Sequence, residues 1–341
     1  MSQFIIRGAE LNDVDQVLGL AEQFSLLNLP ADKRVLWKKI ERSVESFAGE
    51  RAKEEAEYLF LVEDRETGIV VASSLIIAKH GTEQHPHFYF DVIKRDHYSK
   101  DLGLGFIHQV LRLGIETNGP SEIGGLLVDK AYRRRPEKIG RQASLVRFQY
   151  MGIYPDRFEN DVLCEFAPPL TDEGRSEFWE ALGRRFTGLP YQEADMISQE
   201  NKEFIQTLFP SGDIYLSLLD AKARLVVGRV SPETKGAQYM LQRLGFRYRD
   251  QVDPFDGGPH YGARLREMSL VKNTRSFVVS KFTKGIDFNK QGFVGMERDG
   301  RYRSIYVNFA LQEENVLLPE KSFALLGVEA GESLWVSPYG E

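Results

Sequence analysis

Cysteine is almost missing from this sequence, since its 341 residues include only Cys164. A single thiol forms no internal disulfide and cannot supply the thiolate set of a structural zinc site. No export signal is visible at the N-terminus, and no apolar run approaches the length of a membrane span. We therefore expect a protein of the reducing cytoplasm that does not contact membranes, with Cys164 as an inert residue of an apolar strand.

An excess of positive charge is also missing. Lys and Arg total 44 against 50 for Asp and Glu, which gives a formal net charge of −6. Such a chain as a whole does not attract a phosphate polymer, so nucleic acid is not an expected partner. Hydrophobic residues at 42% and charged residues at 28% are typical of globular proteins and argue against a coiled coil or a disordered chain.

Strand-like and helix-like segments alternate along the chain. Residues 4–7 read as a short strand, two helical patterns follow, and β-rich runs come at 58–62 and 69–78. A further strand at 123–128 leads through a basic, glycine-bearing turn into a helix near Gly140. This order is typical of acyl-CoA N-acyltransferases. It predicts an α/β (α+β) fold with a mixed, mostly antiparallel sheet flanked by helices.

The pattern changes twice toward the C-terminus. Ser176 is expected to cap a helix whose apolar face continues to Phe186, within a helical insertion at about 170–235. Short strands separated by glycines dominate from about Ser276. We therefore expect an acyltransferase domain over 1–270 and a small β-rich domain over 271–341.

The strand at 123–128 and the basic turn before Gly140 together suit the binding of coenzyme A. The pantetheine arm can pair with strand backbone, while the pyrophosphate meets N–H groups at the N-terminus of the next helix. A solvated surface is the alternative interpretation of the arginine run. The predicted cofactor-binding residues are Leu126, Leu127, Val128, Arg134, Arg135, Gly140 and Arg141.

Longer segments resemble one family. The residues at 173–186, 245–249 and 255–259 are similar to those of arginine N-succinyltransferases, and the resemblance extends over about 4–260. It implies a GNAT-like fold and the transfer of a succinyl group from succinyl-CoA, as co-substrate, to the α-amino group of L-arginine in arginine catabolism. It also implies substrate-binding roles for Asp256, Gly257, Gly258 and Glu122.

The chemistry agrees with this choice of nitrogen. A guanidinium stays protonated at physiological pH, whereas an α-amino group with a pKa near ~8 is partly neutral at pH 7. Attack on the thioester produces an oxyanion, which a backbone N–H near Leu126 would stabilise, and a general acid would protonate the leaving thiolate.

Several positions depart from the resemblance. Ser231 stands where the family has a histidine that is taken as the proton donor, and a hydroxyl does not titrate near neutrality. His260 lies where the family does not usually have histidine and is the other candidate proton donor. Tyr89 and Asp91 replace an asparagine and an arginine, which points toward a different ligand.

Histidines cluster at His80, His85, His87 and His97. Two imidazoles at His85 and His87 would share one face of a strand, but no carboxylate falls at a recognised spacing. We therefore expect no metal site.

Three functions remain open. The first is arginine N-succinyltransferase; the second is a related acyltransferase with another acyl donor or amine acceptor. The third is a catalytically silent subunit that binds CoA or arginine. The expected partners are small molecules together with a second copy or a paralogous subunit, because some members of the family combine two related chains.

Overall fold

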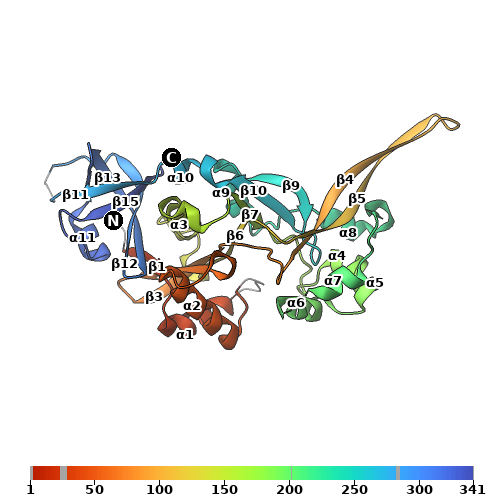
Figure 1. The fold of residues 1–341 in the computed structure, drawn as a ribbon, viewed down its shortest axis with the longest axis horizontal. Coiled ribbons are helices and arrows are strands. Elements are labelled where there is room, and N and C mark those ends of the chain that lie inside the picture. The colour runs from red at the N-terminus through yellow and green to blue at the C-terminus, as the bar shows by residue number, and fades with distance from the viewer. Residues whose placement is uncertain (1–2, 24–28, 201, 282–284, 341) are drawn as a thin grey trace. The chain divides into compact units, whose positions relative to one another are not determined.

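A computed structural model describes residues 3–23, 29–200, 202–281 and 285–340 of the chain (Figure 1). The chain divides into two compact units, each assembled from separate stretches of sequence. Unit 1 comprises Met1–Lys79, Ser121–Val162 and Arg264–Glu341, and unit 2 comprises His80–Pro120 and Leu163–Ala263. Among the described residues, no helix has both the length and the apolar character that crossing a membrane requires.

Unit 1 begins with antiparallel strands covered by helices on both faces. Neighbouring strands are β1 (Phe4–Gly8), β2 (Glu57–Asp64), β3 (Ile69–Ile77) and β6 (Ser121–Val128), in that order. The helices are α1 (Val14–Ala21), α2 (Lys33–Phe47) and α3 (Ile139–Ile153).

Strand β2 shows why both faces need cover, because every one of its residues is buried. Leu59 and Leu61 belong to the apolar cluster shared with α1 and α2. Tyr58 and Phe60, which alternate with them, contact the ring of Tyr150 on α3. The period of two along a strand therefore sends one set of side chains to each helical layer.

The C-terminal part of the chain is rich in strands, as the sequence predicts. It contains α10 (Ser269–Lys272), β11 (Arg275–Val279), β12 (Lys290–Arg298), β13 (Arg301–Gln312), β14 (Asn315–Leu317), α11 (Glu320–Leu326) and β15 (Ser333–Pro338). Strand β13 pairs with β1, with Ile6 opposite Ser304. Ile5 accordingly shares a hydrophobic cluster with Val294 and Ile305, so this segment continues the sheet of unit 1.

Unit 2 is built on a second set of antiparallel strands. Their order is β10 (Pro259–Arg264), β9 (Arg247–Val252), β4 (His87–Ser99), β5 (Leu104–Glu116) and β8 (Ile214–Tyr215), and β7 (Asp161–Glu165) lies beside β10. The helices of this unit are α4 (Glu177–Ala181), α5 (Gly183–Thr187), α6 (Tyr191–Glu200), α7 (Glu203–Leu208), α8 (Ala221–Val226) and α9 (Lys235–Arg243).

One predicted helix is broken in two. The Ser176 hydroxyl caps α4 by accepting a hydrogen bond from the N–H of Trp179, as expected. The helix then stops, and α5 starts anew at Gly183. A Cβ at Gly183 would lie 2.2 Å from the Trp179 ring, so the tryptophan packs over the glycine. The prediction of one continuous helix through Phe186 was wrong because periodicity does not report this local packing.

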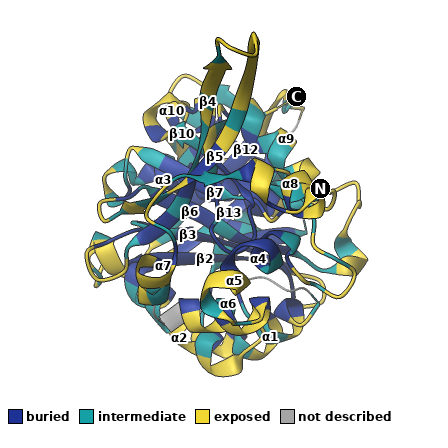
Figure 2. Cartoon of the chain, turned by 90° about the vertical axis from the view of Figure 1, so that its right-hand side faces the viewer, coloured by how far each residue is buried: buried dark blue, intermediate teal, exposed yellow. Residues whose placement is uncertain are grey.

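The hairpin of β4 and β5 projects past the helices of unit 2 (Figure 1). Its tip is strongly exposed (Figure 2) although several of its side chains are apolar. The exposed apolar side chains of the tip are Tyr98, Leu102, Leu104, Phe106 and Ile107.

Candidate active site

Strand β6 of unit 1 carries a one-residue bulge. Its register with β3 shifts between Ser73 and Leu75, so that Gly125 and Leu126 together face one residue of β3. Gly125 has a φ of +57°, and a Cβ there would lie 2.8 Å from the Cβ of Leu75. A bulge of this kind takes one residue out of the hydrogen-bonded ladder and re-aims the backbone beside it.

The same strand is followed, after the basic loop at 129–138, by α3. Lys138, which precedes the helix, has a left-handed φ of 53°. A Cβ on Gly140 would lie 3.3 Å from Cγ2 of Val128, so the first turn of α3 packs against the end of β6. The prediction that this strand and helix are consecutive and adjacent is confirmed. The N-terminus of this 15-residue helix presents backbone N–H groups and the positive end of the helix dipole.

The predicted arginines of this turn have different surroundings. Arg135 donates to the Ala131 carbonyl at 2.9 Å, and its guanidinium lies 3.9 Å from the centre of the Tyr132 ring, so it stabilises the loop itself. Arg134 is exposed and has a left-handed φ of 60°. Arg141, in contrast, lines a pocket at the start of α3.

This pocket has a volume of about 760 Å³ and belongs wholly to unit 1. It combines basic side chains with aromatic and amide ones, a mixture that suits a phosphate group joined to a flat heterocycle. The residues that line it include Lys138, Arg141, Gln142, Phe288, Tyr306, Asn308 and Lys321.

The other predicted residues of β6 differ in exposure. Leu126 and Val128 are half-buried and Leu127 is buried, as alternation along a strand requires. Glu122 is 2% exposed and lies opposite Ile77 of β3. Unit 1 thus holds Glu122, whereas Asp256, Gly257 and Gly258 lie in unit 2.

In unit 2, two histidines are in direct contact. Nε2 of His80 lies 2.8 Å from Nδ1 of His87, which is a hydrogen bond between the two rings. His80 follows β3 in a loop, and His87 is the first residue of β4. His85 lies in the loop and is exposed, so the prediction that His85 and His87 share a strand face was wrong.

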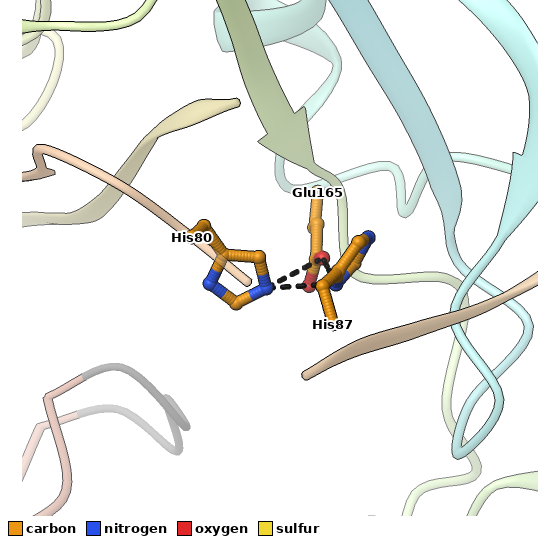
Figure 3. A group of neighbouring side chains, drawn as sticks. All are labelled: His80, His87 and Glu165. Atoms are coloured by element: carbon orange, nitrogen blue, oxygen red, sulfur yellow. Dashed lines mark hydrogen bonds and ion pairs between the residues drawn. The ribbon is translucent and has the colours of Figure 1, made fainter. Parts of the chain in front are cut away.

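A glutamate from a distant segment joins this pair (Figure 3). Oε1 of Glu165, the last residue of β7, lies 3.9 Å from Nε2 of His80 and 3.7 Å from Nδ1 of His87. Nε2 of His260 is 3.5 Å from the same oxygen. The structure therefore supplies the carboxylate that the spacing along the sequence did not reveal.

His260 reaches the cluster from β10, opposite an irregular stretch of β9. Pro259 pairs with Val252 and Tyr261 pairs with Tyr248, so three residues of β9 face His260 alone. Its side chain is completely buried, and its ring lies 5.3 Å from the His87 ring at an interplanar angle of 29°. Burial, together with the neighbouring His80 and His260, lowers the pKa of His87 well below its ordinary value.

A group of carboxylates surrounds the turn that joins β9 to β10. Oδ1 of Asp256 accepts from the N–H of Gly258 at 2.7 Å, and Asp253 accepts from the N–H of Asp256 at 3.0 Å. Burial and the nearby Asp253 raise the pKa of Asp256 well above its usual range. The same two causes raise the pKa of Asp195, on α6, to about 7. Negative charge is thus concentrated at this turn, and the positive charge of Lys202 only partly offsets it at Asp195.

The two glycines of this turn allow the chain to pass close to other elements. Gly257 has a φ of +77°, and a Cβ there would lie 3.1 Å from the Phe178 ring. A Cβ on Gly258 would lie 2.2 Å from the Phe166 carbonyl oxygen. The conformation of the turn and its packing account for both glycines.

Ser231 lies between α8 and α9. Its N–H donates to the Ala167 carbonyl at 2.9 Å, and its hydroxyl accepts from the N–H of Glu233 at 3.4 Å. The serine thus closes a local turn.

Asp91 is another position that departs from the family resemblance. Its carboxylate accepts a hydrogen bond from the Gln251 side chain at 3.1 Å.

Glu165 is the residue of the cluster that sequence reasoning missed. The available signal was a charged residue after the apolar run 162–164, directly after Cys164, which is buried as expected. Such a signal is weak, because strands commonly end in charged residues at the protein surface.

A bulged strand running into the N-terminus of a helix, within a sheet covered by helices, defines the class of acyl-CoA acyltransferases. The predicted fold class is confirmed by the solved structure of the arginine/ornithine succinyltransferase subunit AI from Pseudomonas aeruginosa, which matches with a TM-score of 0.85. That match covers 99% of each chain at 26% identity.

The sequence comparisons identify the family within this class. The model of the arginine N-succinyltransferase beta subunit family matches residues 4–270. Arginine N-succinyltransferases of Escherichia coli O6:K15:H31 and Shigella dysenteriae serotype 1 are each 30% identical over 331 residues, covering 96% of this chain and 95% of theirs. The chain belongs to the arginine N-succinyltransferase family.

Proposed function

We propose that this chain transfers the succinyl group of succinyl-CoA to the α-amino group of L-arginine, releasing CoA and N2-succinyl-L-arginine. The observation that carries the proposal is the bulge at Gly125 and Leu126, followed in the same segment by the N-terminus of α3. Membership of the family supports the choice of both substrates.

The donor binds along unit 1 in this proposal. The pantetheine arm pairs with the backbone at 126–128, and the pyrophosphate meets the N–H groups at the start of α3. Lys138 and Arg141 supply positive charge beside the pocket of about 760 Å³, which receives the nucleotide end of CoA. The backbone N–H at the bulge stabilises the oxyanion that forms when the amine attacks the thioester.

The acceptor is a cationic amino acid in this proposal. The charge of Asp253 raises the pKa values of both Asp195 and Asp256, as a neighbouring carboxylate does. A bound guanidinium would relieve that repulsion. The α-amino group, not the guanidinium, is the nucleophile because it can lose its proton near neutral pH.

Ser231 and His260 remain the candidate proton donors for the leaving thiolate. The Ser231 hydroxyl can only relay a proton. His260 is fully buried, so it would exchange a proton with the substrate through a neighbour, and Glu165 is such a neighbour at 3.5 Å. The location of the protein in the cytoplasm likewise stays a prediction.

Thiol release from acyl-CoA tests the proposal. Purified protein is mixed with succinyl-CoA and L-arginine, ornithine, lysine or agmatine, and free CoA is followed with a thiol reagent. We expect release with succinyl-CoA and arginine and none with Nα-acetyl-arginine, whose α-nitrogen is blocked. Equal release with acetyl-CoA, or with another amine in preference to arginine, would instead favour a related acyltransferase.

A silent subunit is the second candidate function, and Ser231 is the observation that favours it. A chain with an intact donor site but no proton donor would bind CoA without turnover. Binding to the native state alone raises the melting temperature, so CoA should stabilise such a chain although no thiol is released. The absence of any stabilisation by saturating CoA would contradict both candidates.

We also propose that the chain associates with a second copy through the tip of the β4–β5 hairpin. The support is the row of exposed apolar side chains at the tip, together with the subunit status named for the similar Pseudomonas protein. Sedimentation should show a dimer or larger assembly that Phe106→Glu and Ile107→Glu dissociate. If the unmodified chain sediments as a monomer, it does not associate with a second copy, and a paralogous subunit is left as the partner.

A further inference from the structure

We propose that His80, His87 and Glu165 form a binding site for a zinc ion in unit 2. The inference does not depend on the proposed acyl transfer. Each residue offers one ligand atom, and these atoms all lie within 4.8 Å of one another. Figure 3 shows His80, His87 and Glu165 turned toward a common point, although they come from a loop and from two different strands.

Small movements bring the three ligand atoms to the spacing that a zinc ion requires. With zinc–ligand bonds of about 2.0–2.1 Å and tetrahedral angles, neighbouring ligand atoms lie about 3.3 Å apart. The three distances here are 2.8 Å between the imidazole nitrogens and 3.7 and 3.9 Å from the nitrogens to Oε1 of Glu165. Binding therefore requires the two rings to separate and the carboxylate to approach, each by roughly half an ångström.

The backbone holds the two histidines together. Gly81 has a φ of +94°, and a Cβ there would lie 2.7 Å from the Glu116 carbonyl oxygen and 3.0 Å from the His87 Cβ. The N–H of His80 also donates to the Pro120 carbonyl at 2.7 Å, and a Cβ on Gly119 would lie 2.0 Å from the His80 carbonyl oxygen. Two glycines thus let this loop pack against the start of β4, which lowers the ordering cost of bringing the ligands together.

The ligand set selects the class of metal. Two imidazoles and one carboxylate suit zinc, whereas magnesium and calcium prefer sites built from oxygen atoms. Three protein ligands leave one position of a tetrahedral ion open for water or a carboxylate. The ion has a route of entry, because the side chains of His80 and Glu165 are 19% and 25% exposed.

A second group shares Glu165 and combines it with Asp253 and His260. It offers one imidazole and two carboxylates, which is a poorer set for zinc. The side chain of His260 is also fully buried, so an ion reaches it less readily than it reaches His80. We therefore assign the ion to the group that contains His80 and His87.

Zinc binding by the full chain tests the proposal. The protein is stripped with a chelator and titrated with Zn²⁺ alone, by calorimetry and by metal analysis after desalting, with no acyl-CoA or amine present. We expect one zinc per chain, and an absorption spectrum of four-coordinate cobalt when Co²⁺ is used instead. Failure here leaves the thiol-release assay untouched, so the two proposals fail separately.

Matched variants locate the ion. His80→Ala and Glu165→Gln should each weaken zinc binding by at least about 10-fold, whereas His85→Ala removes an exposed imidazole from the same loop and should change nothing. Circular dichroism confirms that each variant is folded, and His80 is chosen because His87 is buried in β4. No binding by the unmodified chain, equal loss in His85→Ala, or loss in His260→Ala with none in His80→Ala would overturn the assignment.

Discussion

Units 1 and 2 contribute chemistry in different ways. In unit 1 the strand β6, its bulge, the basic turn and α3 follow one another within residues 121–153, and the groups offered to a ligand are largely backbone N–H groups. In unit 2 the groups are side chains, which come from a loop, β4, β7 and β10.

We expect this difference to decide which part of the site tolerates substitutions. Backbone groups are kept by any sequence that keeps the bulge and the helix, so the donor end tolerates replacements of its side chains. A site made of side chains changes its chemistry with each substitution, as we expect for Ser231 and His260. We expect donor binding to be the more robust property and acceptor chemistry the more specific one.

The largest effect is expected from the bulge itself. Gly125→Ala places a Cβ against Leu75 in a left-handed conformation, which should lower the free energy of unfolding by about 3 kcal/mol. Gly19→Ala is the matched control, because nothing lies within 4 Å of its Cβ on α1, and it should raise stability by roughly 0.5–1 kcal/mol. Urea unfolding measures the free energy of unfolding of both variants. Equal values would show that the bulge does not require glycine at position 125.

A gain of function is expected in unit 2. If the chain lacks an effective proton donor, Ser231→His should raise turnover by ~10², because an imidazole titrates near neutral pH and a hydroxyl does not. Ser217→His, which adds an exposed histidine on the same unit, is the control. Rates are measured by thiol release from succinyl-CoA.

His260→Ala completes that test. An active chain that loses turnover in this variant has its proton donor on the β10 side of the cluster. If neither Ser231→His nor His260→Ala changes the rate of an active enzyme, both placements of the proton donor are wrong.

Changing the charge at the start of α3 should have a moderate effect on the affinity for CoA. Arg141→Glu together with Lys138→Glu puts negative charge beside the pocket and should weaken CoA binding by ~10-fold or more. Arg34→Glu together with Lys38→Glu makes the same change at two exposed positions of α2. The shift in melting temperature at several CoA concentrations gives the affinity, and an equal response of the two proteins would remove the pocket from the donor site.

The smallest effect concerns pH and the carboxylates of unit 2. Because the pKa of Asp195 is raised to about 7, the folded chain keeps this proton over a range where the unfolded chain has lost it. Stability from this group is therefore present below pH ~4 and is lost as the pH rises to about 7. Asp195→Asn should be more stable than the unmodified chain by about 1 kcal/mol at pH 8, with a smaller difference at pH 5, since the group is partly exposed.

Urea unfolding at the two pH values makes that comparison. Glu193→Gln, an exposed carboxylate on the same helix, should show no such dependence. If Asp195→Asn raises the free energy of unfolding equally at pH 5 and pH 8, the pKa of Asp195 is not raised in the folded chain.

Much of unit 1 could be predicted from the sequence, because its strands and helices follow from patterns of residues that are close together in the chain. Apolar residues at strand and helix spacing predict β6 and α3, and their direct succession predicts that the two pack together. The bulge was not predicted, since Gly125 by itself does not reveal which residue of β3 lies opposite. The break after α4 was likewise hidden, because it follows from the Trp179 ring lying over Gly183.

The sequence by itself determined the fold class, the donor segment of unit 1 and the family, because these rest on local periodicity and on long shared segments. Only the tertiary structure decided that Glu165 joins His80, His87 and His260. Strand order and the close packing of the loop at Gly81 bring these residues together, and both are contacts between distant parts of the chain. Periodicity reports the conformation of each strand, but it carries no information about which strand ends meet.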